Sequence, residues 1–271
     1  MIIIMVISYQ YIQPGEDNHN DRIILATTTS LDNSGLLNEI LPPFIEENQI
    51  RVDVVSVGTG KALELGRQGD VDLIMVHSPQ AEKEFIDQGY GNNRYTPFYN
   101  YYLLLGPPSD PAGVEGTDIL TALSSIYQRK ASFTSRGDES GTHLKEKELW
   151  EKSGVTANNW SPDWYYSTGQ GMGATLNIAS EKKSYTLCDQ ATYLTYKQEL
   201  SLKPLIEEKN RLLRNPYSLI TVNPEMHPHL NYYQAKKLTE HILSEETSRL
   251  IEDYTHEGEP LFYLKEKAGN Y

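Results

Sequence analysis

The chain has little of what several common classes of protein require. Its 271 residues include one cysteine, Cys188, which excludes disulfides within the chain and zinc sites built from cysteines. Its apolar stretches fall short of the roughly 20 residues that a membrane-spanning helix needs. Lys and Arg total 24 against 37 Asp and Glu, and the formal net charge of −13 argues against binding to nucleic acid or to anionic lipid.

The first 21 residues differ in character from the rest of the chain. Residues 1–7 (MIIIMVI) are apolar, and a polar stretch with several Asn and Asp follows over residues 10–21. No Lys or Arg precedes the apolar run, and no A-x-A cleavage site follows it. We expect residues 1–21 to be the remnant of an export signal or a disordered tail.

Apolar runs alternate with helical periodicity along the remaining chain. Strands are predicted over residues 22–27, 51–57, 71–76, 98–105, 131–135, 185–188 and 217–222. Helices are predicted over residues 36–45, 61–68, 118–127, 140–153, 172–181 and 189–197, from Pro79 onward, and as one long final helix over 233–254. Pro42 and Pro43 should end or kink the first helix, because proline lacks an N–H and crowds the preceding turn. This alternation predicts an α/β fold with parallel sheets flanked by helices.

The two halves of the chain carry similar turns from strand to helix. Residues 32–35 (DNSG) and 138–141 (DESG) each follow a predicted strand and open a predicted helix, and residues 58–63 (GTGKAL) and 169–174 (GQGMGA) form a looser pair. Helix N-termini carry unpaired N–H groups and partial positive charge, so small, hydroxyl-rich helix starts suit an anion. Any one of them is an ordinary N-cap. Four in matching positions predict an anion-binding cleft between two lobes.

Arg136 is the cation placed directly in one of these turns, where its guanidinium can bind an oxyanion. The alternative is a surface arginine paired with Asp138 or Glu139. Enzymatic signatures are incomplete: residues 58–61 (GTGK) lack the first glycine and the following Ser or Thr of a phosphate loop, and no G-x-S-x-G elbow is present. His143, three residues after Ser140, suggests an activated serine, but no third group that would orient it is evident.

Several of these segments together resemble the tungstate-binding proteins of ABC uptake systems, the TupA type. The resemblance extends from Arg22 to about Tyr254 and is most specific at residues 135–143 (SRGDESGTH). It also rests on residues 27–30, 34–37, 76–79, 168–173 and 215–224.

The resemblance implies a two-lobed periplasmic-binding-protein fold of the second type, α/β in class. Each lobe would be a mostly parallel sheet flanked by helices, with two strands crossing between the lobes near residues 98–105 and 215–219. Lobe one is expected over residues 22–104 plus 218–271, and lobe two over residues 105–217. An oxyanion would lie between the lobes, bound by hydrogen bonds and without direct metal ligands. The ligand-binding residues carried over by motif are Thr28, Thr29, Ser30, Thr59, Ser78, Arg136, Ser140, Gly141 and Thr142.

The function implied is that of a non-catalytic, periplasmic and monomeric receptor that captures tungstate, needs no cofactor and delivers its ligand to an ABC permease. A receptor for molybdate, sulfate or phosphate is an alternative function. A phosphate receptor would need a hydrogen-bond acceptor such as Asp32 or Asp138. An enzyme acting on a small anionic substrate, with His143 or His77 as base, is a further alternative, as is a cytoplasmic anion-sensing module.

One departure from the family pattern concerns residues 189–192 (DQAT), where members often have Asp-Arg-Gly-Thr. Gln190 replaces that arginine, so a contact at the cleft edge or between the lobes is expected to be weaker.

Overall fold

The structure, a computed structural model, describes residues 22–156 and 160–264. The expectation for residues 1–21 lies outside these ranges. Within them, no helix is both long enough and apolar enough to cross a membrane.

The described chain alternates strands and helices as far as α8, and short strands end it. The strands are β1 (Arg22–Thr28), β2 (Arg51–Val57), β3 (Leu73–Val76), β4 (Gly91–Gly106), β5 (Phe133–Ser135), β6 (Tyr165–Ser167), β7 (Thr186–Asp189), β8 (Lys203–Ile206), β9 (Arg214–Val222), β10 (Thr255–His256), β11 (Glu259–Pro260) and β12 (Tyr263–Leu264). The helices are α1 (Thr29–Asn33), α2 (Leu37–Asn48), α3 (Thr59–Gln68), α4 (Pro79–Asp87), α5 (Ile119–Arg129), α6 (Gly141–Lys152), α7 (Met172–Lys182), α8 (Gln190–Tyr196), the 3-10 helix η3 (Lys197–Glu199), α9 (Tyr232–Ile242) and α10 (Glu245–Asp253).

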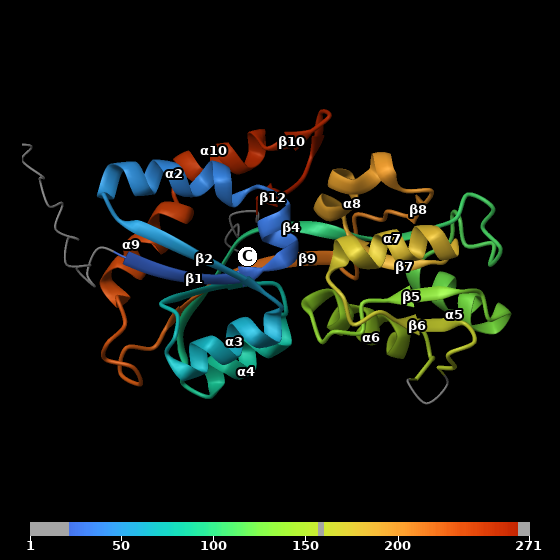
Figure 1. Ribbon diagram of the computed structural model, residues 1–271, viewed down its shortest axis with the longest axis horizontal. Helices are drawn as coiled ribbons and strands as arrows, with labels where there is room; N and C mark the ends of the chain where they lie inside the picture. Colours follow the sequence, from blue (N-terminus) through green and yellow to red (C-terminus); the bar gives the residue numbers. More distant parts are fainter. Residues whose placement is uncertain (1–21, 157–159, 265–271) are drawn as a thin grey trace, which may run out of the picture.

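Two lobes lie side by side, and β4 and β9 run from one to the other (Figure 1). One lobe holds β1 to β3 with α2 to α4, α9 and α10, and the other holds β5 to β8 with α5 to α8. The expected crossovers fall within β4 and β9, so the predicted α/β, two-lobed architecture is confirmed.

The main sheet has the strand order β12-β4-β9-β3-β1-β2. The strand β1 pairs in parallel with both β2 and β3, whereas β9 lies antiparallel between β3 and β4. At its far end β4 pairs antiparallel with β7 and β8, so one 16-residue strand belongs to the sheets of both lobes. In the second lobe β5 pairs in parallel with β6, and Phe133 bridges to Tyr185 just before β7. The carboxyl ends of β1, β3 and β5 therefore lie at the boundary between the lobes (Figure 1).

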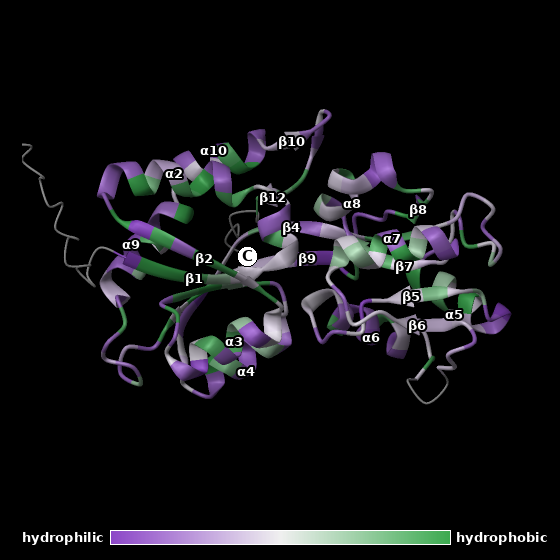
Figure 2. Cartoon of the chain, viewed as in Figure 1, coloured by the Kyte–Doolittle hydropathy of each residue, from purple (hydrophilic) through white to green (hydrophobic). Residues whose placement is uncertain are grey.

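The cores follow from the alternation of side chains along the strands. Leu25 of β1 packs in a cluster with side chains of α2 and α9, whereas its neighbour Ala26 packs in a cluster with side chains of α3 and α4 on the opposite face. Apolar residues line the helix faces turned toward the sheets, and hydrophilic ones face outward (Figure 2). Full burial of a large apolar side chain such as Phe44 stabilises the fold by about 1.5–3 kcal/mol.

Four sequence predictions differ from the structure. Pro42 and Pro43 do not end their helix, since α2 continues through both to Asn48, and the alternative expectation of a kink stays a prediction. The long final helix is two helices, because the Ser244 side chain accepts a hydrogen bond from the Thr247 N–H and starts α10. The strand β4 begins seven residues earlier than the predicted start at Phe98. The short strands β6 and β8 were not predicted.

The matching of the two D-x-S-G segments is also wrong in one half. Residues 138–141 do open a helix, with Ser140 as the N-cap of α6. Ser34, however, is the C-cap of α1, and its hydroxyl donates to the carbonyl oxygen of Leu31 at 2.6 Å. The helix start in the first lobe is instead Thr28, whose side chain accepts from the Leu31 N–H at 3.3 Å.

Candidate functional site

The N-termini of α1 and α3 in one lobe face those of α6 and α7 in the other. Gly60, the second residue of α3, has the carbonyl oxygen of Glu139 from the other lobe 4.0 Å from the position of an added Cβ. Gly141, the first residue of α6, lies against the imidazole of His77, which follows β3. The four helix starts therefore lie at the boundary between the lobes (Figure 1), although one of them is the start of α1 rather than residues 32–35. Such a cluster concentrates unpaired N–H groups and positive dipole ends.

Three hydroxyl groups at these helix starts are buried and have no hydrogen-bond partner. They belong to Ser30 of α1, Thr59 of α3 and Thr142 of α6, whose exposed fractions are 2%, 0% and 0%. A buried polar group without a partner costs about 1–3 kcal/mol, so such groups are few in proteins and need a reason. All three are among the nine residues predicted for the site. Hydroxyls of this kind are suited to donate hydrogen bonds to an anion enclosed between them.

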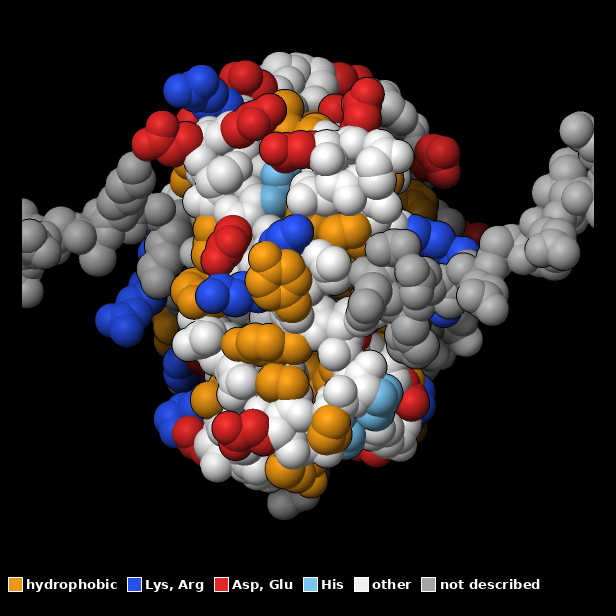
Figure 3. Space-filling model, turned by 90° about the vertical axis from the view of Figure 1, so that its left-hand side faces the viewer, with side chains coloured by type: hydrophobic (Ala, Val, Ile, Leu, Met, Phe, Trp, Pro, Cys, Tyr) orange, Lys and Arg blue, Asp and Glu red, His pale blue; other side chains and the backbone are white. Residues whose placement is uncertain are grey.

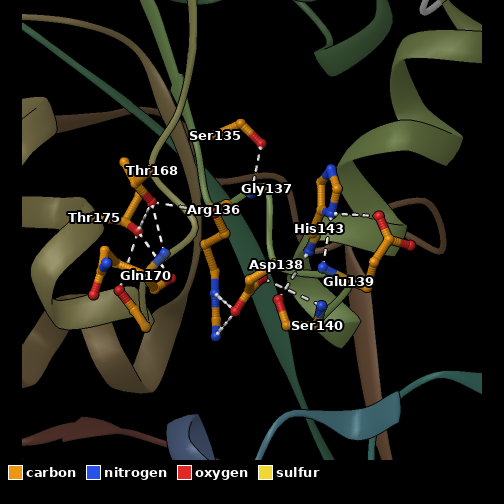
Figure 4. A network of polar contacts seen from close by, with 11 residues as sticks. Ser135, Arg136, Gly137, Asp138, Glu139, Ser140, His143, Thr168, Gln170 and Thr175 are labelled. Atoms are coloured by element: carbon orange, nitrogen blue, oxygen red, sulfur yellow. Dashed lines mark hydrogen bonds and ion pairs between the residues drawn. The ribbon is translucent and has the colours of Figure 1, made fainter. Parts of the chain in front are cut away.

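Arg136 follows β5 and is 3% exposed. Its Nη2 and Nε lie 2.6 and 3.2 Å from Oδ2 of Asp138, as Figure 4 shows. The predicted pairing with Asp138 is thus present, but the alternative of a surface arginine is wrong. Burial acts to raise the pKa of Asp138, but the hydrogen bond from Ser140 and the charge of Arg136 together hold that pKa below its usual value. The guanidinium is the cation that the described structure places among the four helix starts.

The loop before α7 fixes the backbone of Arg136. The N–H of Gly169 and the hydroxyl of Thr168 donate to the Arg136 carbonyl oxygen at 2.8 and 3.1 Å. The Thr168 hydroxyl is also 3.0 Å from that of Thr175 on α7 (Figure 4). Residues 168–173 were noted in the sequence for their small helix start but were not included among the predicted ligand-binding residues. They hold the turn from which the guanidinium extends.

The other predicted residues lie at the same boundary with more defined local roles. Thr28 and Ser140 are N-caps, and the Ser140 hydroxyl accepts from the N–H of His143 at 3.3 Å. Ser78 precedes α4 and is buried, and its N–H donates to Oε1 of Glu82 at 2.6 Å. Thr29 is partly exposed at the start of α1. The structure thus brings all nine residues to the boundary, and direct contact of each with a ligand remains a prediction.

A chain of buried amides beneath the site was missed by sequence reasoning. Asp189 accepts hydrogen bonds from the Thr192 N–H at 3.0 Å and from Nδ2 of Asn100 at 3.2 Å. Asn100 then accepts from Nδ2 of Asn215 at 2.7 Å, and Oδ1 of Asn215 lies 2.8 Å from Nδ1 of His77. The available signal was an asparagine inside the apolar run FYNYYLLL, since a polar residue buried in a strand needs partners.

This series of hydrogen-bonded side chains, from Asp189 through Asn100 and Asn215, fixes the tautomer of His77. The Asp189 carboxylate only accepts, so Asn100 turns its NH₂ toward it and its carbonyl toward Asn215, which in turn presents its carbonyl to His77. Nδ1 of His77 therefore carries the proton, which points to Oδ1 of Asn215 at 2.8 Å with the Tyr102 hydroxyl also 3.1 Å away, and Nε2 is left as an acceptor. Burial lowers the pKa of His77 to about 4, which keeps the ring neutral near pH 7. The chain links both crossover strands to the boundary between the lobes.

The enzymatic alternative with an activated serine finds no support in the geometry. Nδ1 of His143 accepts from the Glu139 N–H at 3.0 Å, and the Ser140 hydroxyl is occupied as a cap. Burial lowers the pKa of His143. In the two described segments of the chain, no three His, Cys, Asp or Glu side chains are grouped to hold a metal ion.

Gln190 does lie at a contact between the lobes, as predicted for that position. Its Nε2 donates to the carbonyl oxygen of Pro260 at 3.2 Å. The strength of this contact relative to one made by arginine remains a prediction.

Comparison with known proteins gives one consistent result. Residues 15–246 match a family described as the PBP superfamily domain. The chain is 45% identical over 245 residues to the tungstate-binding protein TupA of Peptoclostridium acidaminophilum, covering 89% of this chain and 84% of that protein. The crystal structure of the tungstate ABC transporter from Geobacter sulfurreducens is 41% identical with a TM-score of 0.79, over 88% of this chain and 100% of that one. The structure of TupA from Desulfovibrio alaskensis G20 is also 41% identical, with a TM-score of 0.77, and the match covers 90% of this chain and 98% of that one.

Proposed function

The chain belongs to the PBP superfamily and, within it, to the family of TupA tungstate-binding proteins, and on this premise we propose that it captures tungstate between its lobes for an ABC permease. Its relatives are binding proteins of ABC transporters, and the chain is a binding protein rather than an enzyme. The observation that carries the assignment of the site is the set of three buried hydroxyls without partners, on Ser30, Thr59 and Thr142.

The chemistry of the site suits a fully deprotonated dianion. The hydroxyls and helix N–H groups donate hydrogen bonds, and Arg136 supplies a positive charge in a desolvated setting, where charge-assisted bonds are strong. The Asp138 carboxylate, one of the two acceptors considered for a protonated ligand, is already engaged, by Arg136 at Oδ2 and by the Ser140 N–H at Oδ1. Asp32, the other possible acceptor, is exposed. The two carboxylates therefore do not favour a protonated ligand such as hydrogen phosphate, and Nε2 of His77 beside Gly141 is the acceptor near the site that such a ligand would have to use.

Binding is proposed to close the lobes around the anion. Residues 22–104 with those from 218 onward would move as one lobe and residues 105–217 as the other, about β4 and β9. The closed form gains donors from both lobes at once, which is the differential affinity that drives a hinge closure. The contact of Gly141 with His77 and the burial of Arg136 are what a closed form requires.

Binding proteins of ABC uptake systems work outside the cytoplasm, and a permease partner follows from that role. We further propose the periplasm as the compartment and a monomer as the working form.

The proposal is tested by calorimetry and thermal unfolding with tungstate, molybdate, sulfate and phosphate in separate samples. A ligand that binds only the folded state adds RT ln(1 + [L]/Kd), roughly 4 kcal/mol at a thousandfold excess over Kd. Tungstate should give the largest shift and phosphate the smallest. Absence of any shift with all four anions would overturn the oxyanion assignment.

A substitution then tests the site itself. Arg136→Ala should weaken tungstate binding by at least about 100-fold, which corresponds to about 2.7 kcal/mol. Arg249→Ala, on the exposed face of α10, is the matched control and should leave the affinity unchanged. Unchanged affinity in Arg136→Ala, with wild-type binding intact, would show that the anion lies elsewhere.

A further inference from the structure

A cavity of about 600 Å³ lies between the lobes beside the oxyanion site. Its floor is formed by β4 and β9, and its walls by the first residues of α4 and by one face of α6. It borders the site at His77, Ser78 and Gly141, two of which are predicted ligand-binding residues. The cavity exceeds what a single tetrahedral oxyanion occupies, and the three buried hydroxyls of the site do not line it.

The two sides of the cleft are packed differently. On the side of α1 and α8, Ala191 and Leu194 of the second lobe join the apolar core of the first lobe, together with Leu31 of α1. On the side of α4 and α6 the lobes are separated by the cavity and by a second hollow of about 330 Å³. Opening the first side would expose apolar surface, whereas opening the second side would not. The cleft therefore opens most readily between α4 and α6.

The charge lining the cavity is opposite in sign to that of the whole chain. Arg94, Lys145, Arg211 and Arg214 line it against one acidic residue, Glu148. The chain as a whole carries −13, and Figure 3 shows acidic side chains along the upper edge of one end of the molecule. The second hollow is lined by Glu84, Glu148 and Glu151 with one lysine. An approaching dianion thus meets one basic opening and one acidic opening.

Neighbouring groups fix the position of three of the four cations. Nη2 of Arg94 is 2.6 Å from Oε2 of the buried Glu82, and Lys145 lies 3.0 Å from Oε2 of Glu148. The guanidinium of Arg214 lies 3.8 Å from the ring centre of Tyr99. Arg211 is exposed in the turn before β9. The carboxylates of Glu82 and Glu148 balance much of the charge of Arg94 and Lys145, so the net positive charge at the cavity comes chiefly from Arg211 and Arg214.

We infer that this cavity is the entrance of the oxyanion site, and that Arg211, together with Arg94, Lys145 and Arg214, draws the dianion into it. The inference rests on the proposed function. A cleft lined by charge of one sign raises the local concentration of an oppositely charged ligand and its association rate, by about 10-fold to 1000-fold in known cases. Here it also offsets the repulsion from the acidic exterior. The effect is on entry, because none of the four side chains belongs to the predicted set of anion-binding residues.

Association is measured by rapid filtration of the full chain with radiolabelled tungstate, and dissociation by a chase with unlabelled tungstate. Arg211→Glu should slow association roughly five- to tenfold at about 10 mM salt, where the Debye length is roughly 30 Å. The difference should disappear at about 1 M salt, where that length is roughly 3 Å. The dissociation rate should stay the same as in the wild type.

Arg249→Glu is the matched control, because it changes the net charge equally on an exposed face of α10 and outside the cavity lining. It should leave association within about twofold of the wild type. Equal slowing by both variants would mean that net charge alone governs entry, and no slowing by Arg211→Glu would mean that the anion enters elsewhere. Either result overturns the inference. Failure of the wild type to retain tungstate would instead overturn the proposed function.

Discussion

Gly141 of α6 lies directly on the imidazole of His77. A Cβ added to Gly141 would stand 2.7 Å from Cε1 and 2.9 Å from Nδ1 of that ring. The two residues belong to opposite sides of the boundary, and the hydrogen bond of His77 to Asn215 holds the ring in place. Glycine is therefore required at position 141 for this approach, rather than for backbone conformation.

Gly141→Ala should hold the lobes apart. We expect the affinity for tungstate to fall by about tenfold or more, about 1.4 kcal/mol, because the closed contacts cannot all form. The free energy of unfolding of the ligand-free protein should change little, since alanine is well tolerated at a helix start when the lobes are apart and His77 no longer faces it. Calorimetric titration of the purified variant gives the affinity.

Gly60→Ala is its control. Gly60 also faces the opposite lobe, but an added Cβ there has its nearest neighbour at 4.0 Å, an ordinary van der Waals distance. Its affinity should match that of the wild type. If the two variants bind equally well, the approach of Gly141 to His77 does not limit closure.

Thr142→Val should separate stability from binding. The Thr142 hydroxyl is buried without a partner of good hydrogen-bond geometry and lies near the Tyr102 hydroxyl, so its removal should change the free energy of unfolding of the free protein by less than about 1 kcal/mol. The loss of a donor to the anion should weaken tungstate binding about tenfold. Chemical unfolding and calorimetry give the two quantities.

Thr134→Val provides the contrast, since that hydroxyl lies 2.6 Å from the hydroxyl of Ser184. It should lower the free energy of unfolding by about 1 kcal/mol and leave the affinity unchanged. A loss of stability in Thr142→Val without any loss of affinity would argue against a ligand-facing role.

Glu146 should make stability depend on pH. Its carboxylate is buried, accepts from the Tyr165 hydroxyl at 2.6 Å, and has a pKa raised by burial from 4.5 to about 7. The folded protein thus holds this proton more tightly than the unfolded chain does. The stabilisation is complete below pH 4.5 and is lost as the pH rises to about 7.

Glu146→Gln removes that dependence. Between pH 4.5 and about 7, the unfolding free energy of the wild type should fall relative to that of the variant by about 3 kcal/mol. Urea unfolding at a series of pH values measures it. Glu151 is exposed on the same helix, so the unfolding free energy of Glu151→Gln should depend on pH in the same way as that of the wild type. Parallel curves for Glu146→Gln as well would contradict the raised pKa.

His77 should be neutral and protonated at Nδ1 at pH 6. The order of donors from Asp189 to Asn215 imposes that tautomer, and burial lowers the pKa of the ring to about 4. Two-dimensional ¹⁵N–¹H NMR of the imidazole nitrogens distinguishes the tautomers. A proton on Nε2 would show that the amides are ordered differently, and titration near pH 6.5 would contradict the lowering of the pKa by burial.

Much of the fold could be predicted because local patterns specify it. The buried strand before Thr28, the cap at Ser140 and the glycine at the start of α3 each act within a few residues. Arg136 could be predicted as the charge of the site because it stands in the turn between a strand and a helix cap. The resemblance carried by residues 135–143 then added the lobes and the ligand class.

Other elements were decided by packing. The helix α2 continues through Pro42 and Pro43 because Leu41 and Phe44 beside them are buried in the core, and such burial outweighs the helix's loss of N–H groups. The division between α9 and α10, by contrast, is visible in the local sequence, since Ser244 followed by two acidic residues is a typical helix start.

The sequence by itself determined that this chain has small, hydroxyl-bearing helix starts with one arginine among them, because capping and strand propensity depend on neighbouring residues. Only the tertiary structure decided that the hydroxyls of Ser30, Thr59 and Thr142, each at a helix start by the boundary between the lobes, are buried without partners. It likewise decided that Asp189 orients His77 through Asn100 and Asn215. Those contacts join residues as many as 138 positions apart, and they exist only because β4 and β9 carry the chain between two lobes that close on each other.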